Sequence, residues 1–238
     1  MGMARRAAAE FIGSAALAAI VVGSGIAATR LSDDVGIQLL INALATALGL
    51  YVLITVFGPL SGAQFNPAVT LVDAALGSRR VRDLAPYLCA QVLGCVAGTV
   101  LANLMFGLAA VSVSATQRAS AAHLLAEVVA SAGLVVAIFV LVRSDRAVWV
   151  AGVVAAYIGS AYFFTSSTSF ANPAITIGRI FSDTFAGIAL SSAPWFIAAQ
   201  LVGAVIGYAV VRLLVPSAVR SAAPHAAPNA APKTAPKP

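Results

Sequence analysis

The stretch QFNPAVTL runs from Gln64 to Leu71, and a similar stretch, FANPAITI, runs from Phe170 to Ile177. Each contains one Asn-Pro-Ala motif: Asn66, Pro67 and Ala68 in the first, Asn172, Pro173 and Ala174 in the second. Asparagine is favoured as the cap of a helix start. Proline is favoured at the first helical position, because its missing N–H would have no intrahelical partner there. The pattern therefore predicts one helix that begins after Asn66 and another that begins after Asn172.

The composition places both motifs in a membrane protein. Of the 238 residues, 61% are hydrophobic and only 9% are charged, too few for a soluble domain of this length to cover its surface. A helix needs roughly 20 apolar residues to cross the hydrocarbon core. Six stretches predict such helices: about Ala7 to Ala28, Gly36 to Phe57, Leu84 to Gly107, Ser120 to Val142, Val148 to Phe164, and Pro194 to Val215. We expect an all-α membrane protein embedded in the lipid bilayer.

The basic residues predict the orientation of the chain. The net charge is +6, but these residues lie in short loops and at the chain ends rather than on one folded face, so nucleic acid is not an expected partner. If both termini are cytoplasmic, eleven of the 14 Lys and Arg residues lie inside, as the positive-inside rule requires. We expect a multi-pass protein of the inner (cell) membrane. Residues 216–238, rich in Pro and Ala, predict a disordered cytoplasmic tail after one domain at 1–215.

The domain contains an internal repeat. AEFIGSA from Ala9 resembles AEVVASA from Ala126, and CAQVLGCVAG from Cys89 resembles AAQLVGAVIG from Ala198. These blocks and the two Asn-Pro-Ala motifs keep the same order, which indicates two copies at about 1–110 and 115–215. Each copy has three spans. Because three is an odd number, the second copy must be inverted relative to the first.

The helices after the two motifs are too short to cross the bilayer. Only about ten helix-compatible residues follow each motif before polar sequence begins. We therefore expect two half-helices that enter from opposite sides and meet near the middle at Asn66 and Asn172. Each helix start presents roughly half a positive charge, which repels cations. The Asn amides can donate hydrogen bonds to water or to a hydroxylated solute, so the sequence predicts a polar path through the membrane.

The paired Asn-Pro-Ala motifs, the segment SGAQFNPAVT, the Glu of the first and fourth spans and the Ala-Gln of the third and sixth spans resemble the aquaporin and aquaglyceroporin (major intrinsic protein) family. The resemblance covers about residues 7 to 215. It implies a passive, bidirectional channel for water and small polar solutes, one pore per subunit, usually four subunits, and neither a cofactor nor a metal. FANPAITIGR with SDTFAGI resembles, more loosely, a bacterial branch linked with arsenic resistance, which implies undissociated metalloid acids such as arsenite and methylarsenicals.

The residues expected at the external constriction depart from the family pattern. The family usually has Arg directly after the second motif, where this chain has Ile175. Carrying the other positions over by their distance from the two Asn residues indicates Thr46, Ser160 and Ser169. None of the four is aromatic or charged. We therefore expect a wide constriction whose hydroxyl groups partly replace the Arg donors, and passage of glycerol-type solutes larger than water.

Four charged residues are further candidates for roles in the path. Asp73 and Arg179 occupy equivalent positions in the two copies, seven residues after each Asn, and are expected at opposite vestibules. For Arg179, an interfacial position or a pair with Asp183 is an equal alternative. Glu10 and Glu127, the only Glu residues, fall inside spans. The family resemblance implies that both accept hydrogen bonds from the loops that lead into the half-helices.

Other functions fit the sequence less well. A water-selective aquaporin and a non-conducting membrane scaffold stay open as alternatives. An ion-coupled transporter would need titratable partners at the middle of the membrane, and a single carboxylate in each copy does not provide a relay. An enzyme is not expected, because no nucleophile, base or metal-ligand set is clustered in the sequence.

Overall fold

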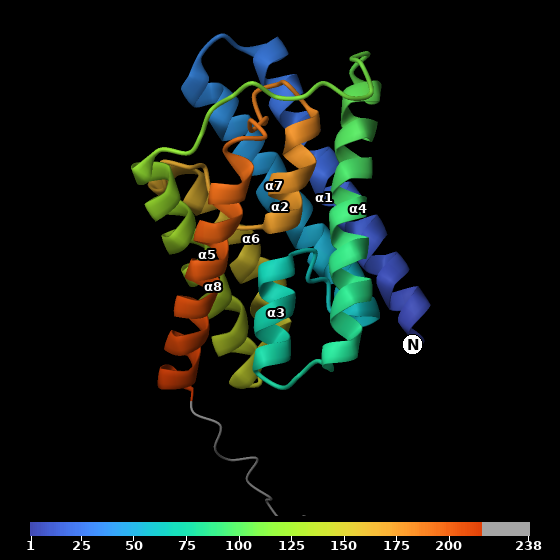
Figure 1. The fold of residues 1–238 in the computed structure, drawn as a ribbon, viewed down its shortest axis with the longest axis vertical. Coiled ribbons are helices and arrows are strands. Elements are labelled where there is room, and N and C mark those ends of the chain that lie inside the picture. Colours follow the sequence, from blue (N-terminus) through green and yellow to red (C-terminus); the bar gives the residue numbers. More distant parts are fainter. Residues whose placement is uncertain (216–238) are drawn as a thin grey trace, which may run out of the picture.

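The computed structural model describes residues 1–215, so the predicted disordered tail lies outside the described residues. Six helices in the described chain are long and apolar enough to span a membrane, as predicted. Figure 1 shows them surrounding two shorter helices. The long helices are α1 (Met3–Leu31), α2 (Val35–Ser61), α4 (Leu84–Met105), α5 (Ala121–Arg143), α6 (Val150–Phe164) and α8 (Ala193–Leu214). Short 3₁₀ segments, η1 (Val81–Asp83) and η2 (Ala147–Trp149), precede α4 and α6.

The two half-helices lie inside the bundle. They are α3 (Pro67–Ala75) and α7 (Pro173–Gly178), and α7 continues as a 3₁₀ turn, η3 (Arg179–Phe181). Both begin at the predicted residues, with Asn66 and Asn172 as N-caps and proline in the first turn. In Figure 1, α3 occupies the lower half of the bundle and α7 the upper half, each between α4 and α8. The fold is thus the expected inverted arrangement of three plus three spans.

The two copies are held by equivalent close helix pairs, α1 with α4 and α5 with α8. Gly98 of α4 lies so near α1 that an added Cβ would overlap the carbonyl of Ala15. On α8, a Cβ added to Gly207 would lie 2.7 Å from the carbonyl oxygen of Ala132 on α5. Small residues allow such backbone approach within a membrane, where packing replaces the hydrophobic effect between helices. These pairs position the Glu-bearing helices beside the half-helices.

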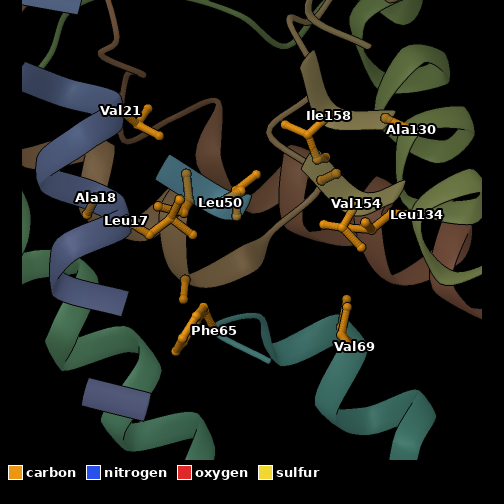
Figure 2. Close-up of a cluster of buried hydrophobic side chains, with 14 of the residues drawn as sticks. Leu17, Ala18, Val21, Leu50, Phe65, Val69, Ala130, Leu134, Val154 and Ile158 are labelled. Carbon is orange, nitrogen blue, oxygen red and sulfur yellow. The ribbon is translucent and has the colours of Figure 1, made fainter. Parts of the chain in front are cut away.

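Buried apolar side chains from both copies converge on the centre of the bundle. Figure 2 shows Leu17 of α1, Val69 of α3 and Val154 of α6 reaching toward one central region. Many apolar side chains on the outside of the bundle are exposed, for example Val52 at 56% and Val205 at 67%. An apolar exterior of this kind suits lipid rather than water. The central cluster is the apolar wall of a cavity, described next.

Candidate functional site

Asn66 and Asn172 each perform two structural tasks at the point where the half-helices meet. The Asn66 Oδ1 accepts from the Ala68 N–H at 2.9 Å, and the Asn172 Oδ1 accepts from the Ala174 N–H at 2.9 Å. Each Nδ2 donates across to the opposite copy: Asn66 to the Ala171 carbonyl at 2.7 Å, and Asn172 to the carbonyl of the residue before Asn66 at 2.8 Å. Since an amide nitrogen carries two N–H groups, one donor per Asn stays available to a solute.

The chain before each half-helix adopts the same unusual backbone conformation in both copies. Ala63 and Phe65 have φ of 46° and 48°, and their equivalents Ser169 and Ala171 have φ of 48° and 45°. Left-handed backbone in non-glycine residues costs of order 1 to 3 kcal/mol each, and persists only where surrounding contacts impose it. Both loops therefore need strong external hydrogen bonds.

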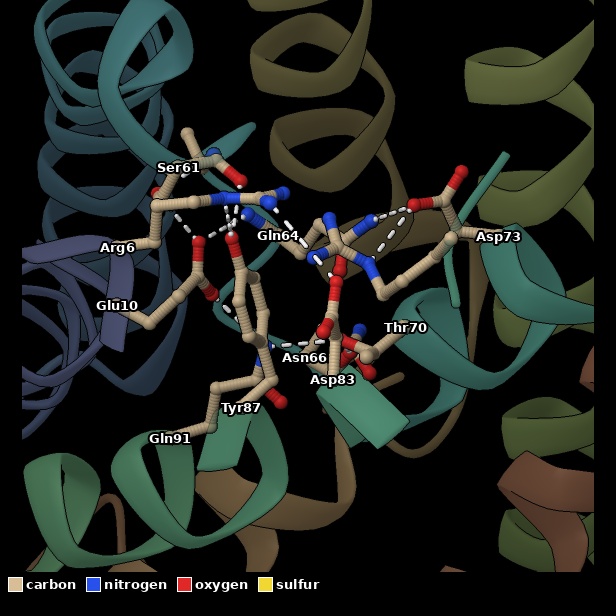
Figure 3. A network of polar contacts seen from close by, with 12 residues as sticks. Arg6, Glu10, Ser61, Gln64, Asn66, Thr70, Asp73, Asp83, Tyr87 and Gln91 are labelled. Atoms are coloured by element: carbon tan, nitrogen blue, oxygen red, sulfur yellow. Dashed lines mark hydrogen bonds and ion pairs between the residues drawn. The ribbon is translucent and has the colours of Figure 1, made fainter. Parts of the chain in front are cut away.

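In the first copy, Glu10 supplies these bonds. Its carboxylate accepts from the N–H groups of Gln64 at 3.1 Å and Phe65 at 2.7 Å, from the Ser61 hydroxyl at 2.6 Å and from Gln91 Nε2 at 2.8 Å. Figure 3 shows Glu10 of α1 and Gln91 of α4 beside the loop. A fully buried carboxylate is costly unless its lone pairs are paired, and four donors satisfy that requirement.

In the second copy, Glu127 makes the equivalent bonds. It accepts from the N–H groups of Phe170 and Ala171, both at 2.9 Å, and from Gln200 Nε2 at 2.7 Å. Gln200 also donates to the Thr176 hydroxyl at 2.9 Å, as Gln91 does to the Thr70 hydroxyl in the first copy. The sequence did not assign a role to these glutamines or threonines, although the repeated Ala-Gln pair was the available signal.

A cavity of about 260 Å³ runs past both Asn residues. Asp73 and Arg79 line the cavity on the side of α3. Thr46 and Arg179 line it on the side of α7. Apolar side chains form most of its wall, together with the loop residues that precede each half-helix. The cavity therefore combines a smooth apolar wall with hydrogen-bonding groups concentrated along the two loops and at the ends.

Three of the four predicted constriction residues line this cavity: Thr46, Ser169 and Ile175. The prediction for Ser160 is wrong. Its side chain is exposed on the outside of α6, and its hydroxyl donates to the Tyr157 carbonyl at 2.8 Å. Ser160 was chosen by its distance in sequence from Asn172, which does not say which way a side chain faces. On α6, every fourth residue faces the cavity: Val150, Val154, Ile158 and Tyr162.

Tyr162 takes the place expected for Ser160. It is buried, it lines the cavity, and its hydroxyl lies 3.0 Å from Thr46 Oγ1. The part of the cavity lining that α6 supplies thus contains an aromatic residue where the prediction had a serine. The Ser169 hydroxyl is buried and has no hydrogen-bond partner among residues 1–215, so it adds a free polar group to the lining.

Arg179 is buried, with 3% of its surface exposed, and does not reach an interface. Its guanidinium lies 3.3 Å from the centre of the Phe170 ring, and its Nε donates to the Ala186 carbonyl. Asp183, the alternative partner, instead accepts from the Ala115 N–H at 3.1 Å. Arg179 therefore belongs to the cavity wall, and both alternatives to a vestibule position are wrong.

Asp73 lies in the opposite half of the cavity and does not carry a free charge. Its Oδ2 accepts from Arg79 Nε at 3.0 Å and from Gln64 Nε2 at 2.7 Å. Asp73 and Arg179, expected at opposite vestibules, therefore do not give the two ends simple opposite charges, because Arg79 neutralises the carboxylate. The sequence predicts no such role for Arg79, only a position on the cytoplasmic side like that of most basic residues.

Comparisons with known proteins agree with this geometry. The model of the family described as Major intrinsic protein matches residues 1–171 and 165–235. The chain is 47% identical over 218 residues to aquaglyceroporin AqpS of Rhizobium meliloti, covering 91% of this chain and 92% of that protein. It is 32% identical over 232 residues to Aquaporin Z of Brucella melitensis, covering 90% and 99%.

The fold is also similar to that of a solved structure. The aquaglyceroporin structure from Plasmodium falciparum superposes with a TM-score of 0.70, covering 91% of this chain and 97% of that chain at 19% sequence identity. The match of the family model over most of the chain and the relative with 47% identity carry the assignment, and the two facing half-helices agree with it. This chain belongs to the major intrinsic protein family.

Proposed function

We propose that the cavity conducts small uncharged polar solutes larger than water, such as glycerol and undissociated metalloid acids including arsenite and methylarsenicals. Members of the family are passive channels for water and small solutes, not enzymes. The proposal that solutes larger than water pass is based on the residue directly after the second motif. Ile175 places an aliphatic side chain where the family pattern has a guanidinium, which leaves room and removes donors from that position.

The remaining polar groups suit hydroxylated solutes. Thr46 and Tyr162 present two hydroxyls on one side of the cavity, and Ser169 presents another from the loop before Asn172. A solute leaving bulk water loses hydrogen bonds, which the lining groups must replace. Hydroxyls both donate and accept, so they fit polyols and undissociated acids. The relative with 47% identity is named an aquaglyceroporin, which supports the same solute class.

Ions are excluded by a different part of the cavity. The starts of α3 and α7 both point at the crossing of Asn66 and Asn172, so two partial positive charges oppose a cation there. The apolar wall offers an anion nothing that replaces its hydration. The proposed channel is therefore passive and insensitive to ion gradients.

Proteoliposomes that contain the purified protein test this proposal. Stopped-flow light scattering would measure water, glycerol, urea and arsenous acid permeability on one preparation. Glycerol flux well above that of empty vesicles is expected, and it should not depend on pH or ion gradients. Water flux without glycerol flux would favour the water-selective alternative, and flux equal to that of empty vesicles would favour a scaffold.

The assignment of Ile175 has its own matched test. Ile175→Arg restores a bulky cation at the constriction and should lower glycerol flux about tenfold more than water flux, a difference of about 1.4 kcal/mol in barrier height. Ser160→Ala is the control, because that side chain lies outside the cavity and its loss should leave both fluxes unchanged. Equal loss of water and glycerol flux in Ile175→Arg would contradict the assignment.

We also propose cytoplasmic termini and assembly as a homotetramer. The orientation follows from the distribution of the basic residues. Single cysteines introduced into a Cys89→Ala background test the orientation. Ser78→Cys places the thiol in the exposed loop after α3, and Ser112→Cys places it in the exposed loop after α4. An impermeant maleimide applied to whole cells should label only the second. The tetramer is tested by the mass of the purified protein in native mass spectrometry.

A further inference from the structure

A second cavity opens on the face of the molecule where α1 begins and α3 ends, here called the N-terminal face. Its volume is about 660 Å³. Four of its eight lining residues are arginines, Arg6, Arg79, Arg80 and Arg82, and Asp83 is the one acidic residue among them. Such a surplus of guanidinium groups around one hollow favours an anion.

Arg79 makes this hollow more than a group of solvated charges. Its side chain is only 5% exposed, and it is fixed by Asp73 at 3.0 Å and by the Tyr87 ring, whose centre lies 3.9 Å from the guanidinium carbon. Its Nη1 is buried and has no hydrogen-bond partner within residues 1–215. A buried donor left unpaired costs about 1 to 3 kcal/mol, so an acceptor that reaches this nitrogen from the hollow stabilises the site.

The other arginines are only weakly neutralised. Arg6 and Arg82 share the two oxygens of Asp83, each at 3.9 Å, the limit of an ion pair. Arg6 also donates to the Tyr87 hydroxyl at 2.9 Å, which holds it next to Arg79. Arg80 has no ion pair in the described part of the chain and is exposed. Asp73 pairs with Arg79 behind the hollow, and Asp83 alone faces the other three guanidinium groups, so the four arginines keep a surplus of positive charge.

We propose that this pocket binds a phosphate group, presented either by an anionic lipid headgroup or by free phosphate, with Arg79 as its buried anchor. Arginine forks match phosphate oxygens, and several converge here. The pocket also lies where η1 leads into the membrane-spanning α4, at the depth of lipid phosphates if the helices are embedded. Because Arg79 also lines the channel cavity beside Asp73, an occupied pocket changes the charge at the channel mouth.

Binding to the purified full-length protein tests the proposal. Inorganic phosphate would be titrated at constant ionic strength, with chloride as the reference salt, and the thermal unfolding midpoint recorded. Lipid retention would be measured by native mass spectrometry after exposure to vesicles of phosphatidylglycerol or of phosphatidylcholine. If the pocket binds free phosphate, we expect phosphate to raise the midpoint by several degrees. If it binds a lipid headgroup, we expect phosphatidylglycerol to be retained in preference to phosphatidylcholine.

The variant Arg80→Gln/Arg82→Gln removes two exposed lining charges and should weaken binding about tenfold or more, as expected for loss of charge-assisted bonds. Arg5→Gln/Arg146→Gln is the matched control, since it removes the same charge from exposed positions outside the pocket. Equal weakening in both variants would reduce the pocket to a general basic surface and overturn the proposal. So would the absence of both the midpoint shift and the lipid preference. Neither outcome bears on solute conduction.

Discussion

Gly13 of α1 leaves the space that the Phe65 ring occupies beside the first half-helix. A Cβ added to Gly13 would overlap two ring atoms, and the third, Cδ1, would lie only 2.8 Å away. The ring cannot easily retreat, because it is 1% exposed and packs edge-on against Phe57 at 5.9 Å. The Phe65 backbone meanwhile donates to Glu10 and accepts from Asn172, so any displacement reaches the crossing of the asparagines.

We predict that Gly13→Ala destabilises the protein although alanine is the better helix former. Overpacking of a close-packed core costs about 1 to 3 kcal/mol, and replacing a mid-helix glycine by alanine returns about 0.5 to 1 kcal/mol. Phe65→Ala should cost about 3 to 5 kcal/mol alone. In the double variant the overlap disappears, because both positions then carry alanine. The second copy has alanine at both equivalent positions, Ala130 and Ala171. The two changes should therefore couple by about 1 to 3 kcal/mol, the size of the relieved overlap.

Denaturant titration of the four proteins of this cycle in mixed micelles measures the coupling, and glycerol flux measured in parallel reports on the crossing. Gly152→Ala is the control, because its new Cβ would meet its nearest neighbour, the Tyr51 ring, at 3.9 Å. That change should be neutral or slightly stabilising. If Gly13→Ala and Phe65→Ala are additive within about 0.5 kcal/mol, the proposed steric link between α1 and the loop is refuted.

Two further predictions concern the helix pairs and the residues around Arg179. Gly98→Val should cost about 3 kcal/mol, because its side chain overlaps the α1 backbone, and a normal yield of folded protein on gel filtration would contradict this. Arg118→Gln removes bonds to the Phe185 carbonyl at 3.0 Å and the Gly187 carbonyl at 2.7 Å, and should cost about 1 to 3 kcal/mol. Since Arg179 donates to the carbonyl between them, the glycerol-to-water flux ratio should also change, whereas an unchanged ratio would place Arg118 outside the selectivity apparatus.

The capping chemistry predicted the half-helices because it is local. An asparagine that bonds two residues ahead, followed by proline, specifies a helix start without help from distant residues, and the structure places both starts at the predicted positions. The six spans were predicted for a related reason, since the thickness of the bilayer sets the number of apolar residues that a helix needs to cross it. The repeat then determined the inverted arrangement through the odd number of spans.

The residues that line the cavity were predicted only in part, because they come from several helices. Thr46 and Ile175 were identified by their distance from the motifs, yet the same counting selected Ser160 instead of Tyr162. A shift of two residues on a helix turns a side chain through more than half a circle. The direction in which α6 faces is set by its packing against α2 and α5, which no local pattern in α6 reports.

The sequence by itself determined that the chain crosses the membrane six times, that its halves are inverted copies, and that two capped helix starts belong to a shared path. These properties depend on composition, spacing and local hydrogen bonding. Only the tertiary structure decided which side chains face the cavity, that Arg179 is covered by Phe170 and Ala186, and that Asp73 is neutralised by Arg79. Those outcomes depend on the rotation and approach of helices far apart in the chain, because burial and pairing are properties of the packed bundle.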